Sequence, residues 1–179
     1  MTDNTEQEQK KIKSAQNILD FTLVNWEEWF IAQKEPKFRA AQIIKWIYVE
    51  HNLEPLKYTD MSRSLREKLA EEFDWSVPMV DSALKSKDGS TKLLLKTARG
   101  EYFESVIMPS EGRTTLCISC QIGCKMGCRF CQTGRMGLLR NLETQEIIGQ
   151  IVAANQWMDE HNNEIAEKKF HPQITNIVF

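Results

Sequence analysis

The segment RTTLCISCQIGCKMGCRFC, residues 113–131, decides how this chain folds. Its first seven residues are typical of a β-strand, and this strand leads into a loop. The segment contains all five cysteines of the 179-residue sequence. Residues 143–158 have apolar side chains along one side of a helix, and residues 174–179 are typical of a second strand. Strand, loop, helix and strand make a βαβ unit, which is almost always right-handed with parallel strands. The sequence therefore predicts an α/β fold.

The residues before this unit change in composition along the chain. Residues 1–13 are polar and are predicted to be a disordered tail. Residues 14–76 show the apolar spacing of an amphipathic helix three times. The pattern starts after Thr22, from Phe38 and after Asp60, which is a good N-cap. This part is predicted to be a small helical domain.

Residues 77–110 are predicted to be a short β meander, because Asp88-Gly89 and Arg99-Gly100 place turn signals between apolar runs. Residues 111–179 then hold the βαβ unit. Its last strand is nearly continuous in apolar character, which is typical of a strand with both faces covered. We therefore expect residues 111–179 to open a longer α/β domain that this chain does not complete. The meander strands are expected at residues 79–86, 91–97 and 101–108.

Composition places the chain among ordinary globular proteins. Hydrophobic residues make up 41% and charged residues 27% of the sequence, and the net charge of −2 does not indicate a general polyanion binder. The N-terminus lacks an apolar signal region, and no stretch approaches the roughly 18 to 20 apolar residues that span a bilayer. A cytoplasmic protein without a membrane partner is expected. In that reducing compartment, clustered cysteines indicate metal ligation or redox chemistry before structural disulfides.

Three interpretations compete for the cysteines. Structural zinc typically uses two C-x2-C pairs a dozen or more residues apart, whereas seven residues separate Cys120 from Cys128. Inert core thiols are disfavoured by the glycines and cations around them. The spacing C-x3-C-x2-C of Cys124, Cys128 and Cys131 favours a [4Fe–4S] cluster with one open iron. A zinc-dependent RNA-binding module without catalysis is the alternative.

The cysteine loop lies in a basic part of the sequence. No acidic residue occurs from Gly112 to Arg140. Such a stretch is either a solvated loop or a site that faces an anion, such as a phosphate backbone or a charged cofactor. Its five basic residues are Arg113, Lys125, Arg129, Arg135 and Arg140.

The cysteine spacing, with the aromatic Phe130 before the third cysteine, matches the radical S-adenosylmethionine signature. Further segments resemble the RlmN/Cfr family of RNA adenine methyltransferases, in order from about residue 22 to the C-terminus. The resemblance implies a helical accessory domain that contacts RNA, followed by the first βαβ unit of a truncated radical S-adenosylmethionine (βα) barrel. The segments are EPKFRAAQIIKWIY, MSRSLREKLAEEF, SKDGSTKLLLK, GEYFESVIMP, RTTLCISCQIGCKMGCRFCQTGRMGLLRNL and EIIGQI.

The resemblance also implies a reaction and its cofactors. Members of the family use a [4Fe–4S] cluster and S-adenosylmethionine to methylate carbon 2 of an adenine in large-subunit ribosomal RNA, and in transfer RNA as well. Methylation of carbon 8 within the same family is the alternative. An electron donor such as flavodoxin is the implied protein partner. The sequence lacks the family's later glycine-rich segment and carrier cysteine, so the chain alone is expected to be inactive.

Residues of this sequence that match the family's motif are expected to have the same roles at the cofactors. Cys124, Cys128 and Cys131 match the cluster ligands, and Phe130 accompanies them at the cofactor site. Cys120 stands where the family commonly has serine, and it stays without an assigned role.

The resemblance assigns two catalytic residues. Cys117 matches the resolving cysteine, which forms a disulfide bond with the carrier cysteine, and Glu104 matches the glutamate that accepts a proton. Arg135 and Arg140 follow the cluster motif and are expected to meet RNA. The cations of the RNA-contacting helical domain are Arg39, Lys45, Arg63, Arg66 and Lys68.

Overall fold

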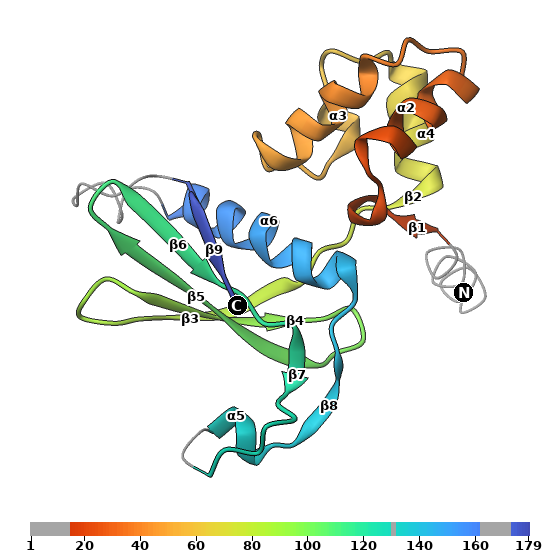
Figure 1. The fold of residues 1–179 in the computed structure, drawn as a ribbon. Helices are drawn as coiled ribbons and strands as arrows, with labels where there is room; N and C mark the ends of the chain where they lie inside the picture. The colour runs from red at the N-terminus through yellow and green to blue at the C-terminus, as the bar shows by residue number, and fades with distance from the viewer. Residues whose placement is uncertain (1–14, 130–131, 162–172) are drawn as a thin grey trace, which may run out of the picture. The chain divides into compact units, whose positions relative to one another are not determined.

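A computed structural model describes residues 15–129, 132–161 and 173–179 (Figure 1). The predicted tail, Phe130 and Cys131 therefore lie outside the described residues. The chain divides into two compact units, Met1–Ser76 and Val77–Phe179.

The first unit is helical. Helix α2 begins after Thr22, whose side chain and that of Asn25 form a capping box. Helix α4 begins after Ser62, and not after Asp60 as the sequence analysis expected, because the Ser62 hydroxyl accepts the backbone N–H of Leu65 at 3.3 Å. The Asp60 carboxylate instead accepts the indole N–H of Trp46 at 2.8 Å. The elements are β1 (Gln16–Asn17), η1 (Ile18–Asp20), α2 (Leu23–Ala32), α3 (Arg39–Tyr48), η2 (Pro55–Lys57), α4 (Arg63–Glu72) and β2 (Phe73–Asp74).

Aromatic side chains form the core of the helical unit. Trp26 and Phe30 are fully buried, and the ring of Phe73 lies 4.9 Å from that of Trp26. Trp46 stacks on Tyr58 with ring centroids 4.8 Å apart. These aromatic side chains therefore pack against one another within the helical unit.

The second unit is built on a five-stranded sheet with the order β3-β4-β5-β6-β9. The first three pairings are antiparallel, whereas β6 and β9 are parallel, as the βαβ prediction requires. The predicted α/β class is confirmed. Because β5 pairs with β6, the segments predicted at 77–110 and 111–179 share one sheet. The elements are β3 (Met79–Lys85), β4 (Thr91–Lys96), β5 (Tyr102–Ser110), β6 (Arg113–Cys117), α6 (Thr144–Glu160) and β9 (Asn176–Val178).

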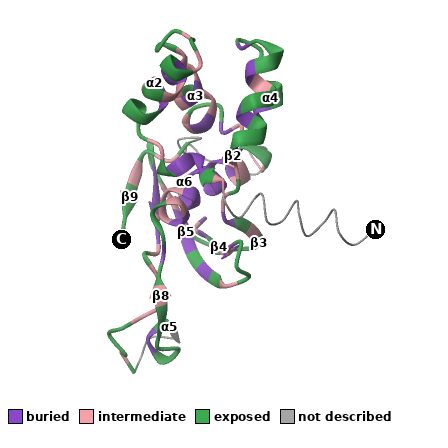
Figure 2. Cartoon of the chain, turned by 90° about the vertical axis from the view of Figure 1, so that its right-hand side faces the viewer, coloured by how far each residue is buried: buried purple, intermediate pink, exposed green. Residues whose placement is uncertain are grey.

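Alternation along the strands gives the sheet two different faces. Leu93 and Leu95 of β4 are fully buried and belong to one hydrophobic cluster with Ala154 and Met158 of α6. Figure 2 shows the buried residues concentrated along α6 and the strands beside it. Lys92 and Leu94 of β4 point to the opposite face, since successive strand residues alternate. That second face carries the candidate site.

Two further strands frame the cysteine loop. β7 (Gln121–Gly123) and β8 (Leu138–Asn141) form an antiparallel ribbon, and the short helix α5 (Gln132–Arg135) lies between them in sequence. Figure 1 shows this ribbon extending away from the five-stranded sheet. The sequence analysis expected only a loop here, so the ribbon is an additional element.

Strand β9 lies at the edge of the sheet and exposes apolar side chains. It is the last strand in the sheet order, and Ile177 and Phe179 are 42% and 82% exposed. Among the described residues, β9 pairs with β6 alone. No helix in the described part of the chain is long and apolar enough to span a membrane.

Candidate active site

Glu104 and Cys117 lie on the same face of two neighbouring strands. Cys117, at the end of β6, is directly opposite Val106 of β5, and Glu104 precedes Val106 by two residues. Residues in this diagonal relation have Cα atoms about 7–8 Å apart. Both line a cavity of about 380 Å³, whose other walls include Leu94, Tyr102 and Met136. The fold thus brings together the two residues that the resemblance makes catalytic.

Lys92 holds the Glu104 carboxylate from the adjacent strand. Its ammonium nitrogen lies 2.9 Å from Oε1 of Glu104, and both side chains are about half exposed, at 46% and 47%. An ion pair this exposed contributes about 0–1 kcal/mol to stability, so its main effect is to orient the carboxylate. Oε2 makes no hydrogen bond to another described residue. The carboxylate therefore keeps one oxygen for a group that enters the cavity.

The segment after Cys117 is hydrogen-bonded to both β5 and β9. The Ser119 hydroxyl donates to the backbone carbonyl of Glu104 at 2.7 Å, and the Ile118 N–H donates to the Val178 carbonyl at 2.9 Å. Cys117 itself is partly buried and carries a free thiol. These contacts place the thiol beside the cavity, between β5 and β9.

The cysteine loop has features that suit an iron–sulfur cluster. The Met126 backbone N–H donates to Sγ of Cys124 at 3.4 Å, and hydrogen bonds to cysteine sulfur are among the features that tune iron–sulfur clusters. Gly134 lies so close to Cys128 that an added Cβ would meet its backbone nitrogen at 2.8 Å. Among the described residues, which do not include Cys131, no three candidate ligands come together. Cys124 and Cys128 therefore stay predicted ligands of the cluster.

Gly123 allows strand β7 to approach Gly137 closely, next to Cys124. Gly123 has a φ of +74°, and a Cβ there would lie 1.8 Å from the carbonyl oxygen of Gly137. The Cys124 N–H donates to this same oxygen at 3.0 Å. The ribbon therefore positions Cys124, the first of the predicted ligands, through a backbone contact that only glycine permits.

Replacing Gly123 by alanine is expected to destabilise the second unit by about 2 kcal/mol or more, since a positive φ and a backbone collision both act against it. Gly112→Ala is the matched control, because Gly112 has a φ of +66° with nothing within 4 Å of an added Cβ. It should cost only the conformational part, about 1–2 kcal/mol. Urea denaturation measures both changes. Equal losses in the two variants would show that the contact with Gly137 is unimportant.

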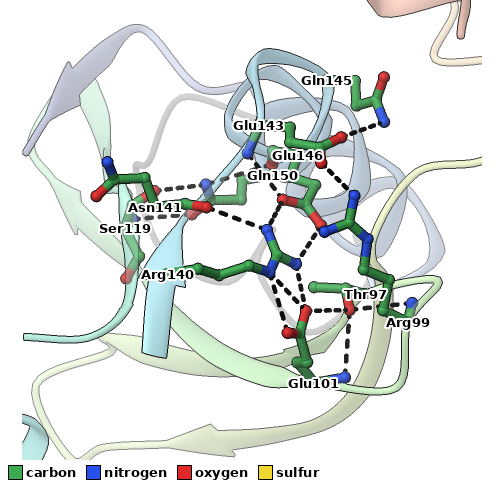
Figure 3. Close-up of polar contacts among 10 residues, drawn as sticks. All are labelled: Thr97, Arg99, Glu101, Ser119, Arg140, Asn141, Glu143, Gln145, Glu146 and Gln150. Carbon is green, nitrogen blue, oxygen red and sulfur yellow. Dashed lines mark hydrogen bonds and ion pairs between the residues drawn. The ribbon is translucent and has the colours of Figure 1, made fainter. Parts of the chain in front are cut away.

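Arg140 of β8 lies inside a network of carboxylates (Figure 3). Its Nε donates to Glu101 at 2.9 and 3.0 Å, and its Nη1 and Nη2 donate to the two carboxylate oxygens of Glu146 at 2.7 and 2.8 Å. The Arg140 side chain is only 18% exposed. Arg140 thereby joins the exit of the cysteine loop to the β4–β5 turn and to the first turn of α6.

The network changes the protonation equilibria of its members. The hydrogen bond from Arg140 is the main cause that lowers the pKa of Glu101. Burial raises the pKa of Glu146, but hydrogen bonds from Arg140 and the Glu143 backbone outweigh it, so the net pKa is lowered. Hydrogen bonds to the two carboxylates raise the pKa of Arg140. All three groups are therefore charged at neutral pH.

The cations assigned to RNA differ in their surroundings. Arg140 is engaged as described, whereas Arg135 is exposed and its Nε donates to the Arg129 carbonyl at 2.8 Å. The cations of the helical unit have partners within that unit, so their contact with RNA stays a prediction. The pairs are Arg39–Glu35, Lys45–Glu50, Arg63–Glu67 and Lys68–Glu72, and Arg66 donates to the Leu56 carbonyl.

Two residues of the site were not found from the sequence. Lys92 gives no signal, because its partner Glu104 lies on another strand. Gln150 gives one: it is a polar residue three positions from Ile147 and four from Ala154, within the apolar side of the predicted helix. Gln150 is fully buried in the structure.

Comparison with known proteins identifies relatives over most of the chain. The ribosomal RNA large subunit methyltransferase N-terminal domain matches residues 16–74. A probable dual-specificity RNA methyltransferase RlmN of Dictyoglomus turgidum is 41% identical over 151 residues, which are 84% of this chain and 43% of the relative. The dual-specificity RNA methyltransferase RlmN of Oleidesulfovibrio alaskensis is 39% identical over 165 residues, or 91% of this chain and 44% of the relative.

A solved structure shares the fold as well. The crystal structure of a radical SAM methyltransferase from Sphaerobacter thermophilus matches with a TM-score of 0.75 and 35% identity, over 92% of this chain and 46% of that chain. The present chain spans less than half the length of these relatives. Since sequence and fold agree over most of its residues, the chain belongs to the RlmN/Cfr family of radical S-adenosylmethionine methyltransferases.

Proposed function

We propose that this chain takes part in the methylation of carbon 2 of an adenine in large-subunit ribosomal RNA, in the cytoplasm, with transfer RNA as a second substrate. The single observation that carries the proposal is the cavity shared by Glu104 and Cys117, next to the ribbon that bears the cysteine loop. The names of the relatives, which are RNA methyltransferases, support the substrate class.

The cysteine loop would hold the cofactors. Cys124, Cys128 and Cys131 would bind a [4Fe–4S] cluster, with Phe130 beside it. With S-adenosylmethionine and an electron donor such as flavodoxin, this cluster supplies one-electron chemistry, which a carbon without a nucleophilic lone pair requires. The loop contributes the N–H of Met126, which donates to the sulfur of Cys124.

Glu104 and Cys117 would act on the adduct that joins adenine to a carrier cysteine through a methylene group. Glu104 would take the proton from carbon 2 of the adduct in its one-electron-oxidised, closed-shell form, which restores the aromatic ring, while Lys92 holds the other carboxylate oxygen. The Cys117 thiolate attacks the carrier sulfur, forming a disulfide. The electron pair of the broken carbon–sulfur bond stays on the methylene carbon, which takes up a proton and becomes the methyl group. Both residues must therefore reach one base, as their shared cavity allows.

Metal analysis tests this proposal. After anaerobic purification and reconstitution with iron and sulfide, we expect about four irons and four acid-labile sulfides per chain. Added S-adenosylmethionine should alter the electron paramagnetic resonance spectrum of the reduced cluster, because it occupies the open iron. Tightly bound zinc without sulfide would contradict the cluster and favour a zinc-dependent RNA-binding module. Mass spectrometry of nucleosides from modified RNA distinguishes carbon 2 from carbon 8.

A further inference from the structure

Gln150 of α6 is an amide with no exposure to solvent. Burying an amide is unfavourable unless its polar atoms are hydrogen-bonded, and an apolar side chain of similar size would fill this space without that requirement. Its neighbours along the helix are apolar and belong to the core of the second unit: Ile147, Ile151, Ala153 and Ala154.

The Gln150 amide binds the backbone of one residue in two places. Its Oε1 accepts the Ser119 N–H at 2.9 Å, and its Nε2 donates to the Ser119 carbonyl at 2.8 Å (Figure 3). Oε1 also accepts the Ser105 hydroxyl at 2.6 Å. A side-chain amide carries an acceptor oxygen and a donor nitrogen side by side, which matches the N–H and C=O of one backbone residue. Gln150 therefore acts as a strand would, pairing with both backbone groups of Ser119.

The position of Ser119 gives this contact its importance. The ladder between β5 and β6 ends with the pair Val106 and Cys117, so Ser119 lies beyond the last ladder partner. Ser119 also separates Cys117 from Cys120, where the chain turns toward the β7–β8 ribbon. Ser119 lies where the chain leaves the sheet, between Cys117 and the cysteine loop. There the Gln150 amide supplies the hydrogen bonds that a neighbouring strand would otherwise supply.

Gln150 also connects this segment to the carboxylate side of the cavity. Ser119 donates from its hydroxyl to the Glu104 carbonyl, and Ser105, the next residue of β5, donates to Gln150. The buried Gln150 amide is therefore hydrogen-bonded to Ser105 of β5 and to Ser119, which follows β6. Through these contacts it fixes Cys117 relative to Glu104. Gln150 has no place in the cavity itself, since its side chain lies on the core side of the sheet.

We propose that Gln150 is a positioning residue. Its two hydrogen bonds to the Ser119 backbone set the location of the Cys117 thiol and of the start of the cysteine loop. The assignment of reactive roles to Cys117 and Glu104 rests on the proposed function. The placement of the thiol by Gln150 is a property of the fold and is tested without any metal or substrate.

The test measures alkylation of the reduced, metal-free chain by iodoacetamide, with peptide mass spectrometry to follow Cys117 against the exposed Cys120. Gln150→Met keeps the length of the side chain and removes both hydrogen bonds to Ser119. We expect alkylation of Cys117 to rise about tenfold relative to Cys120, because the segment now opens locally. Hydrogen exchange of residues 117–120 should accelerate in parallel, while β4 stays protected.

Two controls separate positioning from core packing. Val152→Ala removes buried volume from the same helix and leaves the amide in place, so it should lower the melting temperature without changing Cys117 alkylation. Ser105→Ala removes one partner of Gln150 and keeps both contacts to Ser119, so alkylation should change less than about twofold. If Gln150→Met matched Val152→Ala in both readouts, Gln150 would be an ordinary core residue and the proposal would be wrong.

A second variant covers the case in which Gln150→Met does not fold. In its ionised form Gln150→Glu keeps the acceptor for the Ser119 N–H and loses the donor to its carbonyl, so alkylation of Cys117 at alkaline pH should rise by about threefold. No increase in a folded Gln150→Glu chain would overturn the proposal. Because the assay contains neither iron nor sulfide, a failed cluster reconstitution would contradict the proposed function and leave this result intact.

Discussion

Replacing Arg140 by methionine is expected to lower the free energy of unfolding of the second unit by about 3 kcal/mol, the lower end of the cost of breaking a buried ion pair. The change leaves Glu101 and Glu146, which are 22% and 11% exposed, facing one another without their shared cation. Urea denaturation followed by circular dichroism measures the loss. Hydrogen exchange of peptides from β8 and the start of α6 assigns it to this network.

Two variants control the Arg140 experiment. Arg135→Met removes an exposed guanidinium that donates to a backbone carbonyl, so stability should change by no more than about 0.5 kcal/mol. Arg140→Lys keeps the charge but cannot hold two carboxylates with paired hydrogen bonds, so an intermediate loss is expected. An Arg140→Met chain as stable as the original, with weaker RNA binding, would instead support the RNA contact inferred from the sequence.

The same network predicts how stability depends on pH. A carboxyl group whose pKa is lower in the folded state stabilises the fold above its unfolded pKa, about 4.3 for glutamate, and this stabilisation is lost as the pH falls through the folded pKa. The lowered pKa values of Glu101 and Glu146 both follow this sign. The urea midpoint should therefore fall more steeply below about pH 4.5 in the original chain than in Arg140→Met. Parallel curves would show that Arg140 does not control these carboxyl groups.

The parts of the fold that could be predicted depend on contacts between residues close in sequence. The start of α2 at Thr22 follows from its cap, and the β3–β4–β5 meander follows from the turns at Gly89 and Gly100, which adopt positive φ. The parallel pairing of β6 with β9 followed from the strand–loop–helix–strand order. These signals are local, so a single sequence displays them.

The parts that could not be predicted depend on pairs far apart in sequence. Strands β7 and β8 are three and four residues long, and their register, Gln121 opposite Asn141, spans the whole cysteine loop. Arg140 looked like a free cation because neither Glu101 nor Glu146 could be placed beside it from the sequence. The catalytic assignments of Glu104 and Cys117 came from family resemblance alone, and only the strand register shows that they share one face.

Serine substitution of the individual cysteines is expected to divide them into two groups by iron content. Cys124→Ser and Cys128→Ser should reduce the iron from about four to well below one per chain, because a cube held by three thiolates does not survive the loss of a ligand. Cys131→Ser should reduce the iron content to the same extent, because Cys131 is the third cysteine of the C-x3-C-x2-C motif. Iron and acid-labile sulfide are measured together after anaerobic reconstitution.

Cys117 and Cys120 supply the matched controls, since they are the same residue type in the same segment. Cys117 lines the cavity with Glu104, and Cys120 is exposed at the start of the ribbon, so neither substitution should reduce the iron content. Structural zinc would give the opposite pattern. Two C-x2-C pairs, Cys117 with Cys120 and Cys128 with Cys131, would then hold the metal, and Cys124→Ser would have no effect. Retention of metal in Cys124→Ser, together with its loss in Cys120→Ser, would therefore exclude the cluster and the chemistry proposed for it.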